Sequence, residues 1–505
     1  MVSQLNHPMP PFAAMTLMPW LFELVHLIHT RRAEAPPRNI AATLAASLAF
    51  ALGGCATPVP ESSVEVPVQF AAAPASEVEP DTVWWESYGD PVLSELVRRA
   101  ALENRDVKIA AERVRAARAG ETISRSWLLP SLGVTAGGLD YNTDYGGVAK
   151  QNVPDIQGSG AGASVSWEID ITGRLWSGAK AAEADTLTTA AAARGVRLLV
   201  LTDVATSYFT LVGALRQLDS VRAISAAQDE TLRLVAARHR VGLASTFDVE
   251  RARTAASSAR AAIPPLETLV AVSRHRIAVL IGDQASTAAA IEPWSGVAAV
   301  PEAQPGQPAA LLERRPDLLA SRAQLEAANW RRRQAAAEWF PRLFANALFG
   351  SQNVELNAFD LGSARFSAAS ALLTMPIFNW GRTRAINEIA ASAERQALLS
   401  YEDAIVRALE DVENALVAVR DVRTRADYLQ SAASSADAAL NRAQSLYDRG
   451  QIDLLPLLDV QRSRLTARVA ANDGSTQLLL ATVDLYKALG GGWEVFEPTA
   501  SGGAP

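Results

Sequence analysis

The stretch from Gly162 to Ile171 reads GASVSWEIDI, and its apolar and polar side chains alternate strictly. One face carries alanine, valine, tryptophan and isoleucine, whereas the other carries two serines, Glu168 and Asp170. A period of two is typical of a β-strand with one apolar and one polar face. The alanine-rich, proline-free sequence that follows predicts a helix from Gly173 to Arg240. At about 1.5 Å per residue, this helix would be about 100 Å long, which exceeds the thickness of any compact globular core.

The two halves of the chain repeat each other. Offsets of 208 to 211 residues relate four pairs of turn residues: Pro130 and Pro341, Gly173 and Gly381, Gly242 and Gly450, and Gly282 and Gly490. The motif DVERAR at 248–253 likewise matches DVQRSR at 459–464. Offsets that agree to within three residues across a whole half indicate an internal duplication.

Each half predicts the same order of elements. A first helix (93–126, then 316–339) precedes two strands near 131–141 and 161–171, then near 342–350 and 365–375. A very long helix, a glycine turn and a returning helix follow, so each half contributes one antiparallel helical hairpin. Pro264 and Pro265 must bend or break the first returning helix, whereas Pro456 lies near the start of the second, where a proline is tolerated.

The long helices carry an apolar seam. Residues at alternating spacings of three and four are apolar in both halves: Leu201, Val204, Tyr208, Leu211, Leu215 and Leu218, then Ile405, Leu409, Val412, Leu416 and Val419. Such spacing is typical of coiled-coil-like packing between neighbouring helices.

The four strands need partners from other chains. One alternative is a soluble sandwich in which each strand has one face in water. The chain offers no second sheet, however, and four strands cannot close a barrel. A sheet that spans a membrane must close, because open edges leave backbone groups unpaired in hydrocarbon. Three copies would give twelve strands, with Glu168 and Asp170 facing the barrel lumen and Trp167 facing lipid or the interface.

The N-terminal region predicts a secretory leader that ends at the single cysteine, Cys55. Three arginines precede the apolar run Ile40–Leu52, which is too short to span a bilayer but matches the core of a signal peptide. The run ends in LGGC, which resembles a bacterial lipobox with Cys55 as the lipidated residue. The alternative is a buried or chance thiol. No intrachain disulfide is possible with one cysteine.

Composition narrows the function further. The net charge of −7 over 505 residues argues against a general nucleic-acid binder. His239 and His275 are the only histidines outside the leader, which argues against a histidine metal site or a charge relay. No phosphate-binding glycine loop is present. We therefore expect no enzyme activity, no metal and no cofactor other than the covalent lipid on Cys55.

The predicted domain boundaries follow from these signals: a leader at 1–54, a lipidated spacer at 55–82, a first repeat at 83–292, a linker at 293–313, a second repeat at 314–493 and a disordered tail at 494–505.

Over residues 83–493 the chain resembles the TolC-type outer-membrane efflux channels, specifically their NodT-like lipoprotein branch. The resemblance rests on five motifs: WWESYGDPVLSELVRRAALENRD (84–106), IPPLE (263–267), RRPDLLASRAQLEAA (314–328), LLPLLDVQRSR (454–464) and VDLYKALGGGW (483–493). It implies a mainly α fold with a membrane β-barrel, built as a homotrimer with a shared twelve-stranded barrel and a periplasmic helical tunnel. It further implies an exit channel for small toxic compounds in the outer-membrane lipid, with a periplasmic adaptor and an inner-membrane resistance-nodulation-division transporter as partners.

The resemblance also assigns two sets of residues. Leu455 and Asp459 match a hydrophobic ring and an acidic ring that close the periplasmic end, and their spacing of four places them on one helix face. The alternative is that Asp459 only caps or forms a salt bridge within the helix pair, as its counterpart Asp248 could. The hairpin tips match the positions that contact the adaptor: Val241, Gly242, Leu243, Arg449 and Gly450. Their alternative role is purely conformational.

Two other functions remain open on the sequence. The same duct could serve a type I protein secretion system, in which case an ATP-driven exporter would be its partner. A lipid-anchored helical scaffold that conducts nothing is the other alternative, although a scaffold needs no sheet with a lipid-facing side.

Overall fold

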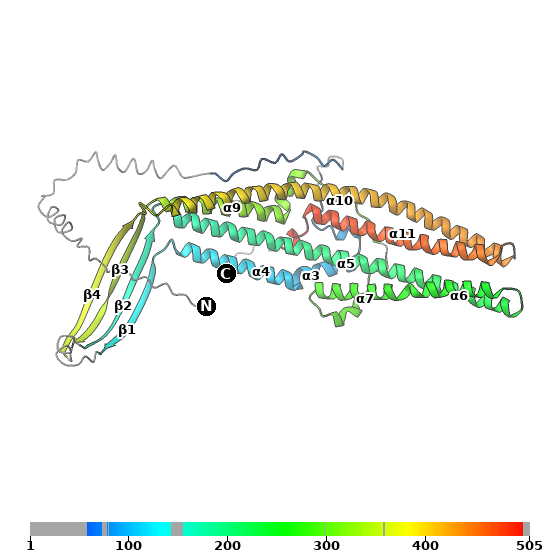
Figure 1. The fold of residues 1–505 in the computed structure, drawn as a ribbon, viewed down its shortest axis with the longest axis horizontal. Coiled ribbons are helices and arrows are strands. Elements are labelled where there is room, and N and C mark those ends of the chain that lie inside the picture. The colour runs from blue at the N-terminus through cyan, green and yellow to red at the C-terminus, as the bar shows by residue number, and fades with distance from the viewer. Residues whose placement is uncertain are drawn as a thin grey trace, which may run out of the picture. The chain divides into compact units, whose positions relative to one another are not determined.

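Long helices make up most of the chain, and a four-stranded sheet lies at one end of them (Figure 1). The computed structural model describes residues 58–72, 78, 80–142, 155–296, 298–302, 304–356 and 359–497. The predicted leader and the predicted lipidation site, Cys55, lie outside the described residues.

The order of elements repeats between the halves, as the sequence predicts, but the predicted single helix 93–126 is wrong: it is divided at Asn104, whose side chain caps the second part. The first half contains α3 (Pro91–Glu103), α4 (Arg105–Ser126), β1 (Ser131–Tyr141), β2 (Ile156–Ile169), α5 (Arg174–Arg240), α6 (Thr246–Ala261) and α7 (Ile263–Leu280). The second half contains α9 (Pro316–Ala336), β3 (Arg342–Leu356), β4 (Phe359–Thr374), α10 (Arg382–Asp448) and α11 (Leu454–Leu489). The short elements are η2 (Glu86–Tyr88), η4 (Ala285–Ala290), η5 (Pro308–Ala310), α8 (Leu311–Arg314), η6 (Ala337–Trp339) and η7 (Glu494–Phe496).

Helices α5 and α10 are each 67 residues long, and each begins after a glycine with positive φ, Gly173 or Gly381. Helix α5 contains a window apolar enough to cross a membrane, but 61% of that window is buried in the structure. Helix α5 packs against α4, α7, α9 and α11, and the burial of the window inside the structure accounts for its apolar composition. The predicted seam of α5 is confirmed, because Leu201, Val204 and Tyr208 are fully buried.

The returning helices differ between the halves. In the first half the helix breaks at Ala262, and Pro264 and Pro265 occupy the first turn of α7, where their missing N–H groups cost little. In the second half, α11 runs for 36 residues without interruption and has Pro456 in its first turn. The predicted effect of both proline positions is confirmed.

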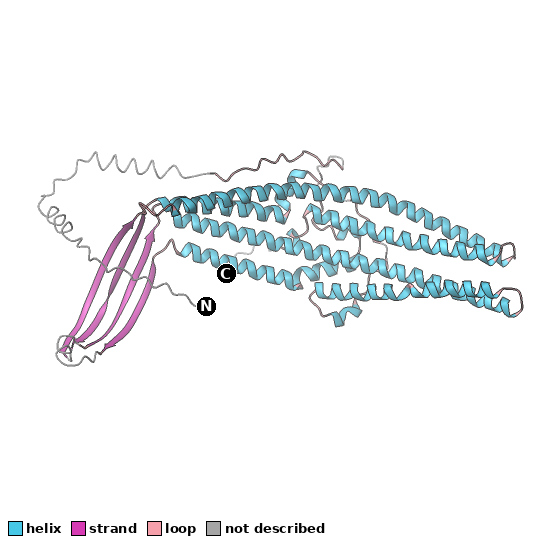
Figure 2. Cartoon of the chain, viewed as in Figure 1, coloured by secondary structure: helices cyan, strands magenta, loops and turns pink. Residues whose placement is uncertain are grey.

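The sheet is antiparallel throughout, in the order β1-β2-β3-β4 (Figure 2). One row of directly opposed residues is polar and consists of Ser131, Ser166, Asn346 and Ser370. The adjacent row lies on the other face and is apolar, with Leu132, Val165, Ala347 and Ala369. Within the described part of the chain, β1 and β4 each pair on one side only, so both outer edges of the sheet are open.

An aromatic core lies around the middle of the helices. Trp84 stacks on Tyr486 with ring centroids 5.4 Å apart, and Trp85 stacks on Phe496 at 5.7 Å. The carboxylate of Glu497 accepts a hydrogen bond from Arg194 at 2.6 Å. The prediction that the disordered tail begins at 494 is therefore wrong, because aromatic stacking and an ion pair hold residues 494–497 on the helices; residues 498–505 lie outside the described part.

Two of the sequence motifs meet in this core. The guanidinium of Arg315, from the RRPD motif, donates to Asp317, to Asp411 and to the carbonyl oxygen of Ala488 at the end of α11. Gly490, from the LGGGW motif, has φ +77°, and a Cβ there would lie 2.6 Å from Cγ of Arg315. The side chain of Arg315 therefore packs directly against Gly490 at the end of α11, where any other residue would bring a Cβ too close.

The predicted spacer packs on the outside of α10. Glu402 accepts hydrogen bonds from the backbone N–H and the hydroxyl of Ser63, at 2.8 and 2.7 Å. The carboxylate of Glu413 accepts from the N–H groups of Ala71 and Ala72, at 2.6 and 2.9 Å. The side chain of Phe70 is buried beside them. Residues 58–72 therefore form a docked segment.

Candidate channel gate and hairpin tips

The first hairpin tip joins α5 to α6 and exposes two apolar side chains, Val241 and Leu243. Gly242 between them has φ 78° and donates its N–H to the carbonyl of His239 at 3.0 Å. Such a left-handed residue ends a helix at low cost only when it is glycine. After the turn, Ser245 and Asp248 form a capping box at the start of α6.

The capping box decides the role of Asp248. Hydrogen bonds from the hydroxyl and the N–H of Ser245 lower the pKa of the Asp248 carboxyl. Asp248 therefore stays ionised and caps the start of α6. This is the capping role that the sequence allows for Asp248.

The second tip has the same glycine geometry with different side chains. Gly450 has φ 71° and donates its N–H to the carbonyl of Tyr447 at 2.9 Å. Arg449 beside it is exposed to solvent. The five predicted tip residues therefore occupy the two turns at the far end of the hairpins from the sheet (Figure 1).

A contact between the two hairpins near their tips was not predicted. Arg238 of α5 donates a hydrogen bond from Nη1 to the hydroxyl of Tyr447 of α10 at 2.6 Å. Its guanidinium carbon also lies 4.6 Å from the centroid of the Tyr447 ring. The two residues are 209 positions apart, so no local pattern in the sequence links them. The one available sign is a single tyrosine, Tyr447, about one helical turn before the second tip.

The predicted gate residues lie in the first two turns of α11. Leu455 is half exposed, whereas Leu457 is buried against Tyr447 and Ala443. Two residues along a helix span about 200°, so the buried Leu457 turns Leu455 and Asp459 away from α10. Asp459 Oδ1 accepts a hydrogen bond from Arg462 at 3.0 Å, and both side chains are mostly exposed.

A cavity of about 690 Å³ adjoins Asp459. Residues of α6, including Phe247 and Arg251, form one wall, and Leu458, Asp459 and Arg462 of α11 form another. Its lining combines charged side chains with apolar ones such as Phe247 and Leu458.

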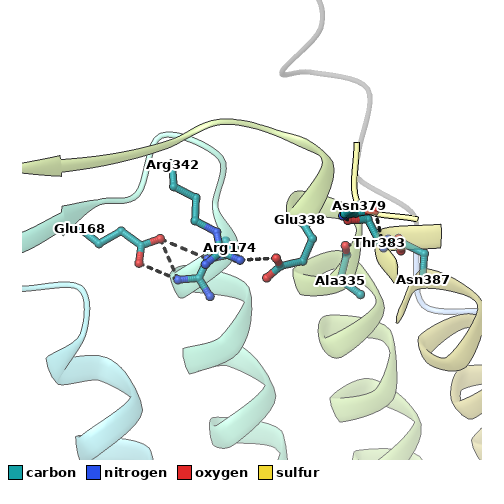
Figure 3. Close-up of polar contacts among 8 residues, drawn as sticks. All are labelled: Glu168, Arg174, Ala335, Glu338, Arg342, Asn379, Thr383 and Asn387. Carbon is teal, nitrogen blue, oxygen red and sulfur yellow. Dashed lines mark hydrogen bonds and ion pairs between the residues drawn. The ribbon is translucent and has the colours of Figure 1, made fainter. Parts of the chain in front are cut away.

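The sheet and the helices meet at a polar junction (Figure 3). Arg174, the first residue of α5, donates to both carboxylate oxygens of Glu168, each at 2.7 Å. Both side chains are largely buried in this bidentate pair. In the second half the equivalent level carries an ion pair between Arg342 and Glu338, and Asn387 donates to the carbonyl of Ala335 at 3.0 Å (Figure 3).

The structure corrects the predicted strand at this junction. β2 ends at Ile169, so Asp170 and Ile171 lie beyond it, and the placement of Asp170 on the strand is wrong. Its carboxylate accepts the N–H of Trp176 at 2.8 Å and so satisfies a free donor at the start of α5. The turn through Gly173 competes with continuation of the strand. Glu168 is on the strand, and its place in the barrel lumen stays a prediction.

A four-stranded sheet at one end of long helical hairpins is also the architecture of solved outer-membrane channels, and this likeness gives the class of protein. The family model of the outer membrane efflux proteins matches residues 96–283 and 308–491, one stretch in each half. The chain therefore belongs to the outer membrane efflux protein family, whose members are outer-membrane channels rather than enzymes. It is a protein of the outer membrane.

Several known proteins are similar over nearly their whole length. Outer membrane protein OprJ of Pseudomonas aeruginosa is 31% identical over 455 residues, which cover 88% of this chain and 95% of that protein. The pyoverdine export outer membrane protein OpmQ of the same organism is 32% identical over 462 residues, covering 89% and 96%. The probable outer membrane lipoprotein SilC of Salmonella typhimurium is 28% identical over 459 residues, covering 89% and 98%.

Among solved structures, the outer-membrane channel OprN superposes with a TM-score of 0.79 at 26% identity, covering 87% of this chain and all of that one.

Proposed function

We propose that three copies of the chain form a passive exit channel of a tripartite efflux pump, through which small toxic compounds cross the outer membrane. The observation that carries this proposal is the four-stranded sheet with two open edges in a protein of the outer membrane. Unpaired edges in hydrocarbon are too costly, so β4 of one copy pairs with β1 of the next. Two copies would give eight strands, whose side chains fill the interior, so three is the smallest number that leaves a passage.

Partners follow from the family. An inner-membrane resistance-nodulation-division transporter supplies energy and substrate, and a periplasmic adaptor meets the hairpin tips. Lipid on Cys55 anchors the mature N-terminus, a proposal supported by the similarity to SilC, which is named as a probable lipoprotein.

Channel recordings test the proposal directly. The purified full-length protein should have the mass of a trimer in detergent and should conduct ions in planar bilayers. A strain without the gene should become sensitive to hydrophobic toxicants and regain resistance with the wild-type gene. A trimer that never conducts, either as wild type or with a widened gate, would refute the channel.

We infer that Leu455 and Asp459 form the gate of this channel. Leu455→Ala and Asp459→Ala should each raise the conductance at least about twofold, because they widen the narrowest rings. Asp248→Ala is the matched control, since Asp248 holds the equivalent position in the first half and caps α6. Equal conductance in the control and in both gate variants would contradict the gate, and the salt bridge to Arg462 would then be the role of Asp459.

The adaptor site has its own test. Val241→Asp and Leu243→Asp should abolish resistance in cells, because a carboxylate would be desolvated at the apolar contact. Their conductance in bilayers should stay unchanged. Val272→Asp, at another exposed valine on α7, is the control and should retain resistance. Retained resistance in the tip variants would mean that the tips have only a conformational role.

Labelled palmitate tests the anchor. Incorporation should occur in the wild type and be lost in Cys55→Ala. Label that persists in the variant would place the lipid elsewhere.

A further inference from the structure

We propose that the copies join in one particular register, with Thr374 of β4 opposite Thr135 of β1 in the next copy, and that an exposed aromatic turn after β4 seals this joint. The inference rests on the proposed assembly of several copies and adds the contact surface through which they meet.

The sheet of a single chain already contains a template for the joint. β2 is the second strand of the first half, and it pairs with β3, the first strand of the second half. In the duplication, β4 corresponds to β2, and β1 corresponds to β3. The pair of β4 with β1 of the next copy therefore corresponds to the pair of β2 with β3 inside one chain. The same local geometry can therefore be used between halves and between copies.

The register follows from two offsets. From β2 to β4 the offset is 208, set by Gly173 and Gly381, which follow the two strands. From β3 to β1 the offset is 211, set by Pro341 and Pro130, which precede the two strands. In the template, Ser166 lies opposite Asn346. Since 166 + 208 = 374 and 346 − 211 = 135, Thr374 comes opposite Thr135.

The pleat of the sheet agrees with this register independently. Ser131 and Ser370 lie in the same row of directly opposed residues and so on the same face. Thr135 and Thr374 are each four residues further along their strands, which returns both to that face. A register shifted by one residue would place the lipid-facing side of one copy beside the lumen-facing side of the next.

The stagger of the strand ends also agrees. Ser131, the first residue of β1, lies opposite Ser166, so β2 extends three residues further toward the helices. β4 likewise extends four residues beyond Ser370 in the same row. In the proposed register β4 ends opposite Thr135, four residues short of Ser131, so the turn after β4 runs beside the start of β1 in the next copy.

That turn exposes apolar side chains that no described residue of the same chain covers. Ile377 is 94% exposed, Trp380 is 90% exposed, and the rings of Phe378 and Trp380 are in contact at 4.9 Å. Trp380 has φ 54°, and it is the one residue other than glycine with positive φ in the described part of the chain. A bulky residue keeps this strained conformation only where contacts with its surroundings compensate for the strain.

The start of β1 offers the matching surface. Trp127 and Leu129, which precede β1, are both about two-thirds exposed. A hydrogen bond of 3.1 Å from the Trp167 indole to the carbonyl of Leu128 holds this segment in place. In the proposed register β4 ends at Thr374 opposite Thr135, so the turn that carries Trp380 comes beside the segment of the next copy that contains Leu129 and the start of β1. The occupant of the aromatic turn is therefore a second copy of the chain, and lipid is the competing outcome.

Disulfide trapping tests the register. The double variant Thr374→Cys, Thr135→Cys, oxidised in membranes, should give covalent dimers and trimers on a denaturing gel. Within one chain the two residues lie on opposite edges, and the row of Thr135 meets β4 at Phe366, eight residues from Thr374. Their separation is therefore about 30 Å, whereas a disulfide needs Cα atoms within about 7 Å. The control pair Thr374→Cys, Leu139→Cys lies four residues out of register and should stay monomeric, as should each single variant.

The outcomes separate this inference from the proposed function. Cross-linking through Leu139 instead of Thr135, with a trimer by mass, would overturn the register and leave the channel standing. Absence of any trimer by mass would overturn both.

The seal has a second test. The pair Trp380→Cys, Leu129→Cys should also cross-link between copies, and Trp380→Ala should lower the temperature at which the trimer dissociates in detergent. If that pair stays unlinked while a fluorescent label on Trp380→Cys is quenched by brominated phospholipid, the turn contacts lipid and the seal is overturned.

Discussion

The two halves of the chain share one plan and differ in how strongly they are held together. A salt bridge links the hairpin helices at the same place in each half: Arg260 to Asp229 in the first, and Arg468 to Asp437 in the second, both residues shifted by 208. In the second half Arg464 joins the pair at 2.7 Å, and the side chain of Asp437 is less exposed than that of Asp229. Duplication thus preserved the geometry, whereas the surroundings set how much each contact stabilises.

The largest difference in the free energy of unfolding is expected between a glycine of the core, Gly282, and a glycine of a hairpin tip, Gly242. Gly282 has φ +86°, and a Cβ there would lie 2.7 Å from the carbonyl oxygen of Glu103. Gly282→Ala should therefore destabilise the protein by about 3 kcal/mol, through backbone strain and overpacking. Gly242→Ala meets nothing within 4 Å, so only the strain of positive φ remains, about 1 kcal/mol. Thermal melting followed by circular dichroism measures both, and equal shifts would contradict the distinction.

A buried polar network distinguishes the first half from the second at one seam position. Tyr208 donates to the carboxylate of Asp90 at 2.6 Å and accepts from the N–H of Trp294, whereas its counterpart is Leu416. Burial and the hydrogen bond to Asp90 both raise the pKa of Tyr208, so its hydroxyl stays protonated.

Removal of this hydroxyl should be costly. Tyr208→Phe removes the donor to Asp90 Oδ2 and the acceptor of the Trp294 N–H, whereas Asp90 Oδ1 keeps the N–H groups of Val92 and Leu93. It should cost about 1 to 3 kcal/mol in the same melting experiment. Tyr428→Phe, at an exposed position of α10, is the control and should melt as the wild type does. A wild-type melting temperature for Tyr208→Phe would mean that water replaces the hydroxyl.

The repeated salt bridge should be worth more in the second half. Asp437→Asn removes the negative charge that faces two arginines and one of its two acceptor oxygens, and should cost about 1 kcal/mol; Asp229→Asn should cost less because its pair is more exposed. Hydrogen exchange of the backbone amides in each hairpin gives the two values separately. An equal loss in both halves would show that Arg464 adds nothing.

The pH dependence sharpens this difference. Burial raises the pKa of the Asp437 carboxyl, but Arg468 and Arg464 outweigh burial, so its pKa lies below the ordinary value. A carboxyl with a lowered pKa in the folded state stabilises above its unfolded pKa, and this contribution is lost as the pH falls through the folded pKa. The exchange difference between wild type and Asp437→Asn should therefore be constant from pH 7 to about 4 and vanish below. A difference that persists in stronger acid would contradict the salt bridge as its origin.

The smallest effect is expected at the link between the tips. Tyr447→Phe removes the hydrogen bond from Arg238 and keeps the guanidinium over the ring, so exchange at the second tip should rise by less than about fivefold, or 1 kcal/mol. Arg238→Ala removes both interactions and should have the larger effect. If both variants exchange as the wild type does, the two tips move independently.

The long helices could be predicted closely because their limits are local. Glycines at 173, 242, 381 and 450 adopt positive φ in the structure, and the predicted breaks at these positions follow from the residues alone. The end of β2 could not be predicted in the same way. Alternation continues through Ile171, but the backbone turns at Gly173, and the carboxylate of Asp170 binds the N–H of Trp176 on the helix side.

Among the candidate sites, positions were predictable and partners were not. The tip residues and the gate residues lie where the motifs place them, in the turns and in the first turns of α11. Arg238 meets Tyr447 at a distance of 209 residues in the chain, Tyr208 meets Asp90 at 118 and Arg315 meets Asp411 at 96, and no short motif contains both members of these pairs.

The sequence by itself determined the duplication, the hairpins, the four strands and membership of a channel family, because periodicity and glycine turns act over a few residues. Only the tertiary structure decided where β2 ends, that residues 494–497 are held on the core, and which arginine meets which carboxylate. These depend on contacts between helices that are distant in sequence, where packing and desolvation outweigh local preference.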